Sequence, residues 1–220
     1  MNLFDILGPV MVGPSSSHTA GAVRIGYISG KLLQDHVRKA EILLHGSFAT
    51  TGIGHGTDKA LIAGLLGMHP DDIRIPASFD LAQKAGMEFT FSTVTLKDAH
   101  PNTAVLRLSG EHGRKIEVQA ASIGGGRILI AKLDGIEVNF TAEKPTLIVH
   151  NVDQPGHVAQ VTTMLAEKQV NIATLQLYRD KRGGYAVMVI ETDQEVPEES
   201  VTWLEQLDGI IKVTYINVEE

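Results

Sequence analysis

Residues 13–19, with the sequence GPSSSHT, place four hydroxyl groups and one imidazole directly before an expected helix. Buried hydroxyls without partners are costly, so a protein core seldom contains such a run. The free N–H groups and the dipole at a helix N-terminus favour an anion, and hydroxyls add hydrogen-bond donors. The alternative is a loop in which one serine caps the helix. Because a cap needs only one serine, we favour a pocket for a small anion such as a carboxylate.

Residues 52–58, GIGHGTD, form the second polar run. Glycines on both sides of His55 leave room for a substrate to approach, and an imidazole accepts a proton near neutral pH. His55 is therefore a candidate general base. The alternative is a glycine-rich connector whose histidine faces water. His45 and Ser47 follow an expected strand and either face the same cleft or merely end that strand.

Two weaker runs are HPNT at 100–103 and SIGGG at 122–126. His100 and Asn102 can donate and accept hydrogen bonds, although proline and asparagine are also ordinary turn residues. The three glycines permit a close approach or a tight strand reversal. They lack the strand-turn-helix context of a nucleotide-binding loop.

Other site classes are disfavoured by the sequence. No G-x-S-x-G elbow accompanies the serines, and the nine histidines show no H-E-x-x-H or comparable spacing, so we expect no zinc site in this chain. The chain has no cysteine, so it cannot form a disulfide or ligate an iron–sulfur cluster by itself. A net charge of −7 argues against nucleic acid or an anionic membrane as the main partner.

The 220 residues suggest one large or two small domains. No apolar run approaches the length of about 20 residues that spans a bilayer, and the N-terminus lacks the basic region of a signal peptide. We therefore expect a cytoplasmic protein.

The elements that position these motifs follow an α+β pattern. Proline-containing residues 141–145 are the expected boundary between a mixed α/β domain at 1–141 and a second domain at 146–220. In the first domain we expect helices near 19–35 and 59–66, the latter capped by Thr57 or Asp58. The expected strands and hairpins of this domain are 40–44, 89–96, 103–108 with 115–121, and 127–133 with 136–140. The sequence pattern of the second domain predicts the element order β-α-β-β-α-β of a ferredoxin-like unit.

Together, GPSSSHT, GHGTDK, HPNT and SIGGG resemble the β chain of iron–sulfur L-serine dehydratase (L-serine deaminase), over nearly the whole chain. The run D-x-P-G at 153–156 and V-N-I at 170–172 resemble an ACT domain. The first domain also resembles, as a fold, the allosteric substrate-binding domain of some 3-phosphoglycerate dehydrogenases.

The resemblance implies an L-serine ammonia-lyase that yields pyruvate and ammonia. It implies a [4Fe–4S] cluster, ligated by cysteines of a separate α subunit, whose iron makes the serine hydroxyl a better leaving group. The lack of cysteine here fits a two-subunit enzyme in which this chain is inactive alone. By match to the GHGTD motif His55 is the best candidate for the base, with His18 beside it. The implied substrate-binding residues are Ser15, Ser16, Ser17, Thr19, Thr57, His100 and Asn102.

The ACT resemblance implies regulation or assembly, with homodimer contacts through this domain. Asp153 and Asn171 match positions at which such domains bind an amino acid, although Asp153 stands where an amide is common. A dimerisation module without an effector is equally compatible with the sequence. For the whole chain, the rival to an enzyme subunit is an amino-acid-binding regulatory module of another enzyme.

Overall fold

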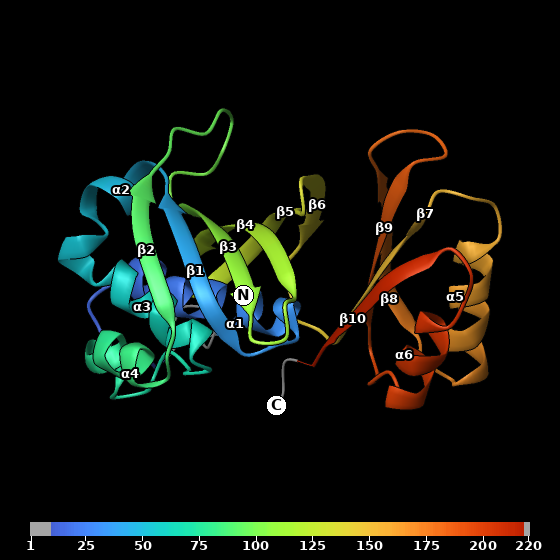
Figure 1. Ribbon diagram of the computed structural model, residues 1–220, viewed down its shortest axis with the longest axis horizontal. Coiled ribbons are helices and arrows are strands. Elements are labelled where there is room, and N and C mark those ends of the chain that lie inside the picture. The colour runs from blue at the N-terminus through green and yellow to red at the C-terminus, as the bar shows by residue number, and fades with distance from the viewer. Residues whose placement is uncertain (1–9, 218–220) are drawn as a thin grey trace, which may run out of the picture. The chain divides into compact units, whose positions relative to one another are not determined.

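The computed structural model describes residues 10–217, and its contacts divide the chain between Gly135 and Ile136 into two units (Figure 1). The strand β6 (Ile136–Phe140) follows this division but hydrogen-bonds at the edge of the first sheet. The domain boundary expected at 141–145 stays a prediction. No helix within residues 10–217 is long and apolar enough to cross a membrane.

The first unit supplies five strands of a six-stranded sheet, to which β6 is added at the edge, in the order β2-β1-β3-β4-β5-β6. Its other strands are β1 (Val37–Leu44), β2 (Glu88–Thr93), β3 (Thr103–Gly110), β4 (Lys115–Gly124) and β5 (Arg127–Leu133). β1 and β2 run parallel, whereas β1–β3, β3–β4 and β4–β5 pair antiparallel. The expected hairpins of β3–β4 and β5–β6 are both present, and the three glycines at 124–126 all adopt positive φ in a tight reversal.

Helices connect and cover this sheet (Figure 1). They are η2 (Ser16–Ala20), α1 (Gly21–Leu33), α2 (Gly46–Thr51), η3 (Ile53–His55), α3 (Thr57–Leu65), η4 (Ile75–Ala77) and α4 (Ser78–Lys84). A parallel strand pair needs a crossover connection, and α2, α3 and α4 supply it between β1 and β2. The short helices α2 and α4 were not predicted from the sequence.

α1 and α3 approach each other until their backbones touch. A Cβ atom built on Gly26 would lie 2.2 Å from the carbonyl oxygen of Leu61, and one built on Gly64 would lie 2.0 Å from that of Val23. Only glycine fits at these two positions, and the crossing is flanked by buried residues such as Ile25. The glycine pair thus sets the distance between the two helices that begin at the polar motifs.

The first helix begins with a wide turn. Residues Ser16–Ala20 form one π-helical turn that leads directly into α1, and the Gly21 N–H donates to the carbonyl of Ser16. Ser15 is the N-cap, because its hydroxyl accepts from the backbone N–H of His18 at 3.1 Å. The helix expected near 19–35 therefore starts earlier than predicted, with its wide turn inside the GPSSSHT run.

The cap expected for the next long helix is wrong. α3 starts at Thr57 after Gly56, whose φ is +70°, and neither Thr57 nor Asp58 is the N-cap residue. The hydroxyl of Thr57 instead donates to the carbonyl of His18 at 3.0 Å. A tertiary partner has replaced the local capping bond that the sequence predicts.

The second unit has the predicted order β-α-β-β-α-β, and this fold prediction is confirmed. Its elements are β7 (Thr146–Val152), α5 (His157–Glu167), β8 (Ile172–Arg179), β9 (Tyr185–Thr192), α6 (Glu198–Glu205) and β10 (Ile210–Ile216). The sheet order β10-β7-β9-β8 leaves β8 and β10 as the edge strands. The core of this unit includes Val149, Leu165 and Met188, all of which are fully buried.

Candidate functional site

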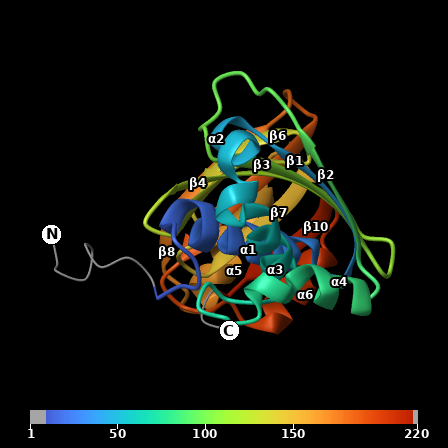
Figure 2. The same ribbon diagram turned by 90° about the vertical axis from the view of Figure 1, so that its left-hand side faces the viewer.

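The polar motifs of the first unit meet beyond the carboxyl end of β1. There the chain turns into α2 and meets the loop that leads from β2 to β3, which rises beside α2 in Figure 2. The Ser47 N–H donates to the carbonyl of Pro101 at 2.8 Å. A Cβ on Gly46, which has a φ of +55°, would lie 2.6 Å from the same oxygen, so glycine is required at this contact.

His18 is the half-buried centre of the group. Its Nε2 atom lies 3.1 Å from the hydroxyl oxygens of both Ser47 and Thr51, and its ring meets the buried ring of Phe48 at 5.3 Å between centroids. Burial lowers the pKa of His18 below its usual value of 6.5, and the neighbouring His55 lowers it further. His18 is therefore uncharged at neutral pH.

His55 lies beside His18 and is exposed. The two ring centroids are 4.9 Å apart, and the Nδ1 atom of His55 lies 2.9 Å from the backbone carbonyl of Thr51. A carbonyl oxygen can only accept, so this hydrogen bond assigns the proton of a neutral His55 to Nδ1. The Nε2 atom then carries a free lone pair, which is the arrangement that a general base needs.

Three hydroxyls of the motifs hold the backbone around these two rings. Ser15 accepts from the N–H of His18, Thr57 donates to the carbonyl of His18, and Thr19 donates to the carbonyl of His55 at 3.4 Å. Thr19 also explains Gly13, whose φ is +129° and whose Cβ would lie 2.7 Å from the Thr19 hydroxyl. The structure thus brings Ser15, His18, Thr19, His55 and Thr57 together.

Ser16 and Ser17 occupy the wide turn itself, and both are half-buried. Their hydroxyls make no hydrogen bond within residues 10–217. These two hydroxyls can therefore donate hydrogen bonds to a ligand, whereas those of Ser15 and Thr19 already bond to the backbone.

His100 and Asn102 lie in the adjoining loop, and within the described chain their side chains make no hydrogen bond or ring contact with His18 or His55. The Nδ1 atom of His100 accepts from the N–H of Asn102 at 3.1 Å, and the carbonyl of Asn102 accepts from Ser122 at 2.9 Å. The HPNT run therefore joins α2 to β4 through its backbone. The side chain of Ser122 packs against Gly21 at the start of α1, where a Cβ would lie 2.1 Å from the hydroxyl.

Thr51 was missed by the sequence analysis, and Ser47 was left undecided. The Ser47 and Thr51 hydroxyls lie 3.2 Å apart and both reach His18. A threonine before a glycine is not a sequence pattern that marks a functional residue. Ser47 and Thr51 meet because residues four positions apart lie on the same face of a helix, here α2. His45 takes a different part: its Nδ1 atom accepts from the N–H of Leu96 at 3.2 Å and holds the base of the loop.

Among residues 10–217 no group of three or more histidine, cysteine, aspartate or glutamate side chains is placed to hold a metal ion. The site is therefore a cluster of imidazoles and hydroxyls. Such a cluster can bind an anion through the hydroxyls and accept a proton at His55.

In the second unit, Asp153 and Asn171 lie at opposite ends of the sheet. Asp153 accepts from the N–H of Gly183 at 2.9 Å and from Arg179 at 3.0 Å, and these bonds lower the pKa of its carboxyl. Asn171 donates to Asp193 at 2.7 Å, beyond the other end of β9. One chain does not bring the two side chains into a single site.

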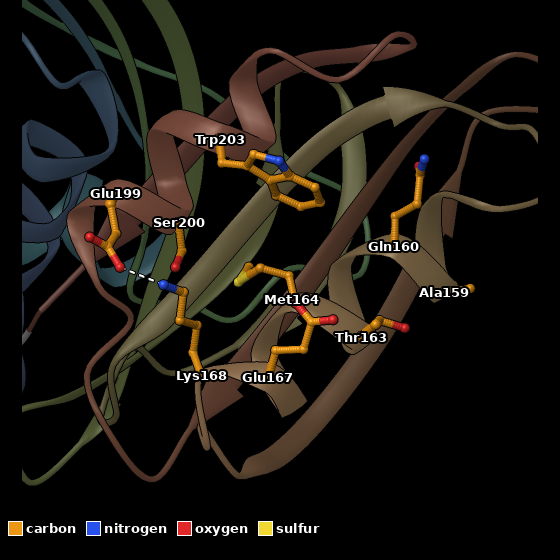
Figure 3. Close-up of a pocket in the computed structure, with 9 residues that line it drawn as sticks. All are labelled: Ala159, Gln160, Thr163, Met164, Glu167, Lys168, Glu199, Ser200 and Trp203. Atoms are coloured by element: carbon orange, nitrogen blue, oxygen red, sulfur yellow. Dashed lines mark hydrogen bonds and ion pairs between the residues drawn. The ribbon is translucent and has the colours of Figure 1, made fainter.

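A separate pocket of about 610 Å³ lies between α5 and α6 (Figure 3). Met164 and the exposed Trp203 form apolar walls, and an ion pair between Lys168 and Glu199 crosses one side. Its other lining residues are Ala159, Gln160, Thr163, Glu167 and Ser200. Neither Asp153 nor Asn171 lines this pocket.

The chain is similar to proteins of known family over both of its units. Residues 2–133 match the family model for the serine dehydratase beta chain, and residues 145–209 match the ACT domain. The L-serine dehydratase, beta chain, of Peptoniphilus asaccharolyticus is 37% identical, and the match covers 98% of this chain and 97% of that protein. The probable L-serine dehydratase, beta chain, of Bacillus subtilis is 40% identical with the same coverage.

A more distant relative is the D-3-phosphoglycerate dehydrogenase of Methanocaldococcus jannaschii, which is 26% identical over 90% of this chain and 37% of that protein. The two β chains match this chain along almost its whole length, across both the histidine cluster and the ACT unit. The chain therefore belongs to the serine dehydratase β-chain family.

Proposed function

We propose that this chain is the β subunit of an L-serine dehydratase that converts L-serine to pyruvate and ammonia. The observation that carries the proposal is the cluster of His18, His55 and surrounding hydroxyls, which gathers the motifs of a β-chain family member at one place. We propose that the enzyme acts in the cytoplasm and needs a second, cysteine-containing α subunit.

The residues of this chain do not fit a [4Fe–4S] cluster, because the chain has no cysteine and its described residues offer no metal-binding group. The proposal assigns the cluster to the α subunit. This chain's own part is to hold the substrate and move a proton.

In the proposed reaction the Nε2 atom of His55 takes the proton from Cα of L-serine. The bond between Cβ and the hydroxyl oxygen breaks as the Cα–Cβ double bond forms. The hydroxide that leaves takes up the proton held by His55, so that water is released and the base is restored. The resulting enamine becomes an imine, which water hydrolyses to pyruvate and ammonia. Hydroxyl donors on the carboxylate stabilise the negative charge that develops when the proton leaves Cα.

The hydrogen-bond pattern divides the proposed substrate residues into two sets. The hydroxyls of Ser16 and Ser17 have no hydrogen-bond partner among residues 10–217, and in the proposal they contact the carboxylate directly. Ser15, Thr19 and Thr57 already bond to the backbone of the two histidines and shape the pocket. His100 and Asn102 complete its wall from the adjoining loop.

The test is co-expression with the α subunit under anaerobic conditions, followed by measurement of pyruvate released from L-serine. We expect the complex to be active and the purified β chain to be inactive. His55→Ala should lower kcat by at least about a hundredfold, because general-base catalysis contributes that much or more, and His18→Ala should also impair activity. His36→Ala, at the far end of β1, is the control. Full activity in both His18→Ala and His55→Ala complexes would refute the site.

The regulatory alternative retains one supporting observation, the similarity of both units to a D-3-phosphoglycerate dehydrogenase. Isothermal titration of the isolated chain with L-serine separates the two proposals. Tight binding, together with an inactive complex with the α subunit, would favour the amino-acid-binding module.

For the ACT unit we propose a homodimer that pairs the two β8 edge strands antiparallel. Such a pairing sets the start of one strand beside the end of the other. Asn171 of one copy then lies near Arg179 and Asp153 of the second, so an amino-acid effector site formed by Asp153 and Asn171 needs two chains.

A further inference from the structure

Thr51, the last residue of α2, contacts both histidines of the site through different atoms. Its hydroxyl oxygen lies 3.1 Å from Nε2 of His18, and its backbone carbonyl lies 2.9 Å from Nδ1 of His55. No other residue between positions 10 and 217 hydrogen-bonds to both rings. Thr51 can therefore influence which ring nitrogen carries the proton in both His18 and His55.

The hydroxyl of Thr51 has a single hydrogen, and the helix provides an acceptor for it. Thr51 donates to the carbonyl of Ser47 at 2.9 Å, as threonine commonly does within a helix. The Thr51 oxygen is then left to accept. When the Ser47 hydroxyl donates to the Thr51 oxygen at 3.2 Å, neither hydroxyl has a hydrogen left for Nε2 of His18, which lies 3.1 Å from both oxygens. This arrangement places the proton of a neutral His18 on Nε2.

The other side of the His18 ring is consistent with this arrangement. Nδ1 of His18 faces the hydroxyl of Ser15 at 3.5 Å, and Ser15 already accepts from the His18 backbone N–H. The hydroxyl hydrogen of Ser15 is therefore free to point toward an unprotonated Nδ1.

We propose that Thr51 is a positioning residue that fixes opposite tautomers on the two histidines. Its hydroxyl holds His18 as the Nε2–H form, and its carbonyl holds His55 as the Nδ1–H form. The part concerning His55 as a base rests on the proposed function, whereas the assignment of the tautomers does not.

The chain offers a matched control in the adjacent residue. Thr50 is exposed, and within the described part of the chain its hydroxyl bonds only to the carbonyls of Gly46 and Ser47. Thr51→Val removes the hydroxyl but keeps the side-chain shape and the carbonyl. Thr50→Val makes the same change one residue away, and Thr51→Ser restores the hydroxyl.

The experiment is ¹⁵N NMR of the imidazole nitrogens in the full-length chain, at a pH where both histidines are neutral. In Thr51→Val the Ser47 hydroxyl loses its acceptor on Thr51 and can donate to Nε2. We therefore expect His18 to shift toward the Nδ1–H form while His55 keeps Nδ1–H. Thr50→Val and Thr51→Ser should match the wild type.

An unchanged His18 tautomer in Thr51→Val would overturn the proposal, as would an equal shift in Thr50→Val. If Thr51→Val does not fold, Ser47→Ala gives a second test, because it spares Thr51 and should retain the Nε2–H form. Loss of that form in Ser47→Ala would assign the role to Ser47 instead.

In the complex with the α subunit we expect Thr51→Val to lower kcat by about tenfold, as the loss of one hydrogen bond predicts. Thr51→Ser should retain most of the wild-type kcat. The two failures are distinguishable: tautomers that shift as expected in a chain whose complex with the α subunit releases no pyruvate from L-serine would keep this proposal and refute the proposed function.

Discussion

His18 and His55 lie side by side, yet their surroundings differ. His18 is half-buried against Phe48, with hydroxyls at both ring nitrogens, whereas His55 is exposed and bonds to a carbonyl. The buried ring is suited to shape the pocket and the exposed ring to exchange a proton with a substrate. This difference is visible only once the two rings are placed together.

The first prediction at this scale concerns the pKa of His18. Histidine ¹H NMR titration should give a midpoint below 6.5, and His55→Ala should raise it, because the change removes a nearby positive charge. His36→Ala should leave the midpoint unchanged. A wild-type midpoint at or above 6.5 would contradict the burial described for His18.

The sign of the corresponding stability effect follows from linkage. Because folding lowers the pKa of His18, the unfolded chain takes up its proton first as the pH falls. The stability tied to the neutral ring is thus present above pH 6.5 and is lost as the pH falls through the folded-state pKa.

At the scale of elements, the contact between α1 and α3 sets the spacing of the site. α1 carries the wide turn with His18 at its start, and α3 begins at Thr57, which bonds to His18. Gly26 and Gly64 let the two backbones touch. Any side chain at the crossing must push these two starting points apart.

Gly64→Ala should therefore lower the free energy of unfolding by about 1–3 kcal/mol, as overpacking does. Gly30→Ala is the control on α1, because its Cβ would find no atom closer than 3.7 Å. That change should be neutral or raise stability by up to about 1 kcal/mol, since alanine favours a helix over glycine. Urea unfolding measures both. A Gly64→Ala protein as stable as Gly30→Ala would contradict the close contact.

The sequence predicted the strands and both hairpins of the first unit, because their alternation and turn glycines are local signals. It missed α2 and α4, which have only six and seven residues and carry little periodicity. The Thr57 cap was wrong because a carbonyl distant in the sequence competes for the hydroxyl. For the same reason Thr51 could not be found, since its two partners lie on other segments of the chain.

At the scale of the whole molecule, the chain combines a histidine–hydroxyl cluster, with no metal-binding group among residues 10–217, with a unit that has two open sheet edges. In our proposal the site therefore needs the metal cluster of the α subunit. The unpaired edge strands of the second unit can pair with a second copy of the chain. Each edge strand carries one exposed large apolar residue, Leu177 in β8 at 45% and Ile211 in β10 at 57% exposure.

These two residues test which edge forms the proposed homodimer. Leu177→Arg should weaken dimerisation at least about tenfold, because it places a charged side chain on the apolar edge that the β8 pairing covers. Ile211→Arg, an equal change on the other edge, should leave it intact. Sedimentation equilibrium gives both dissociation constants. The reverse result would assign the interface to β10.

The wide turn at Ser16–Ala20 has a consequence for the length of the chain. A π-helical turn holds one residue more than an α-helical turn, so deleting Ser16 or Ser17 would let the helix start regularly at no cost in helical bonding. Each residue of an α-helix advances about 100° around the axis, so everything before the deletion would swing to a different side of α1. Ser15 would then no longer meet His18. The number of residues between Ser15 and His18 is thus as strictly constrained as the identity of these two residues. Relatives that bind the same substrate here should carry substitutions in the GPSSSHT run, but no insertion or deletion.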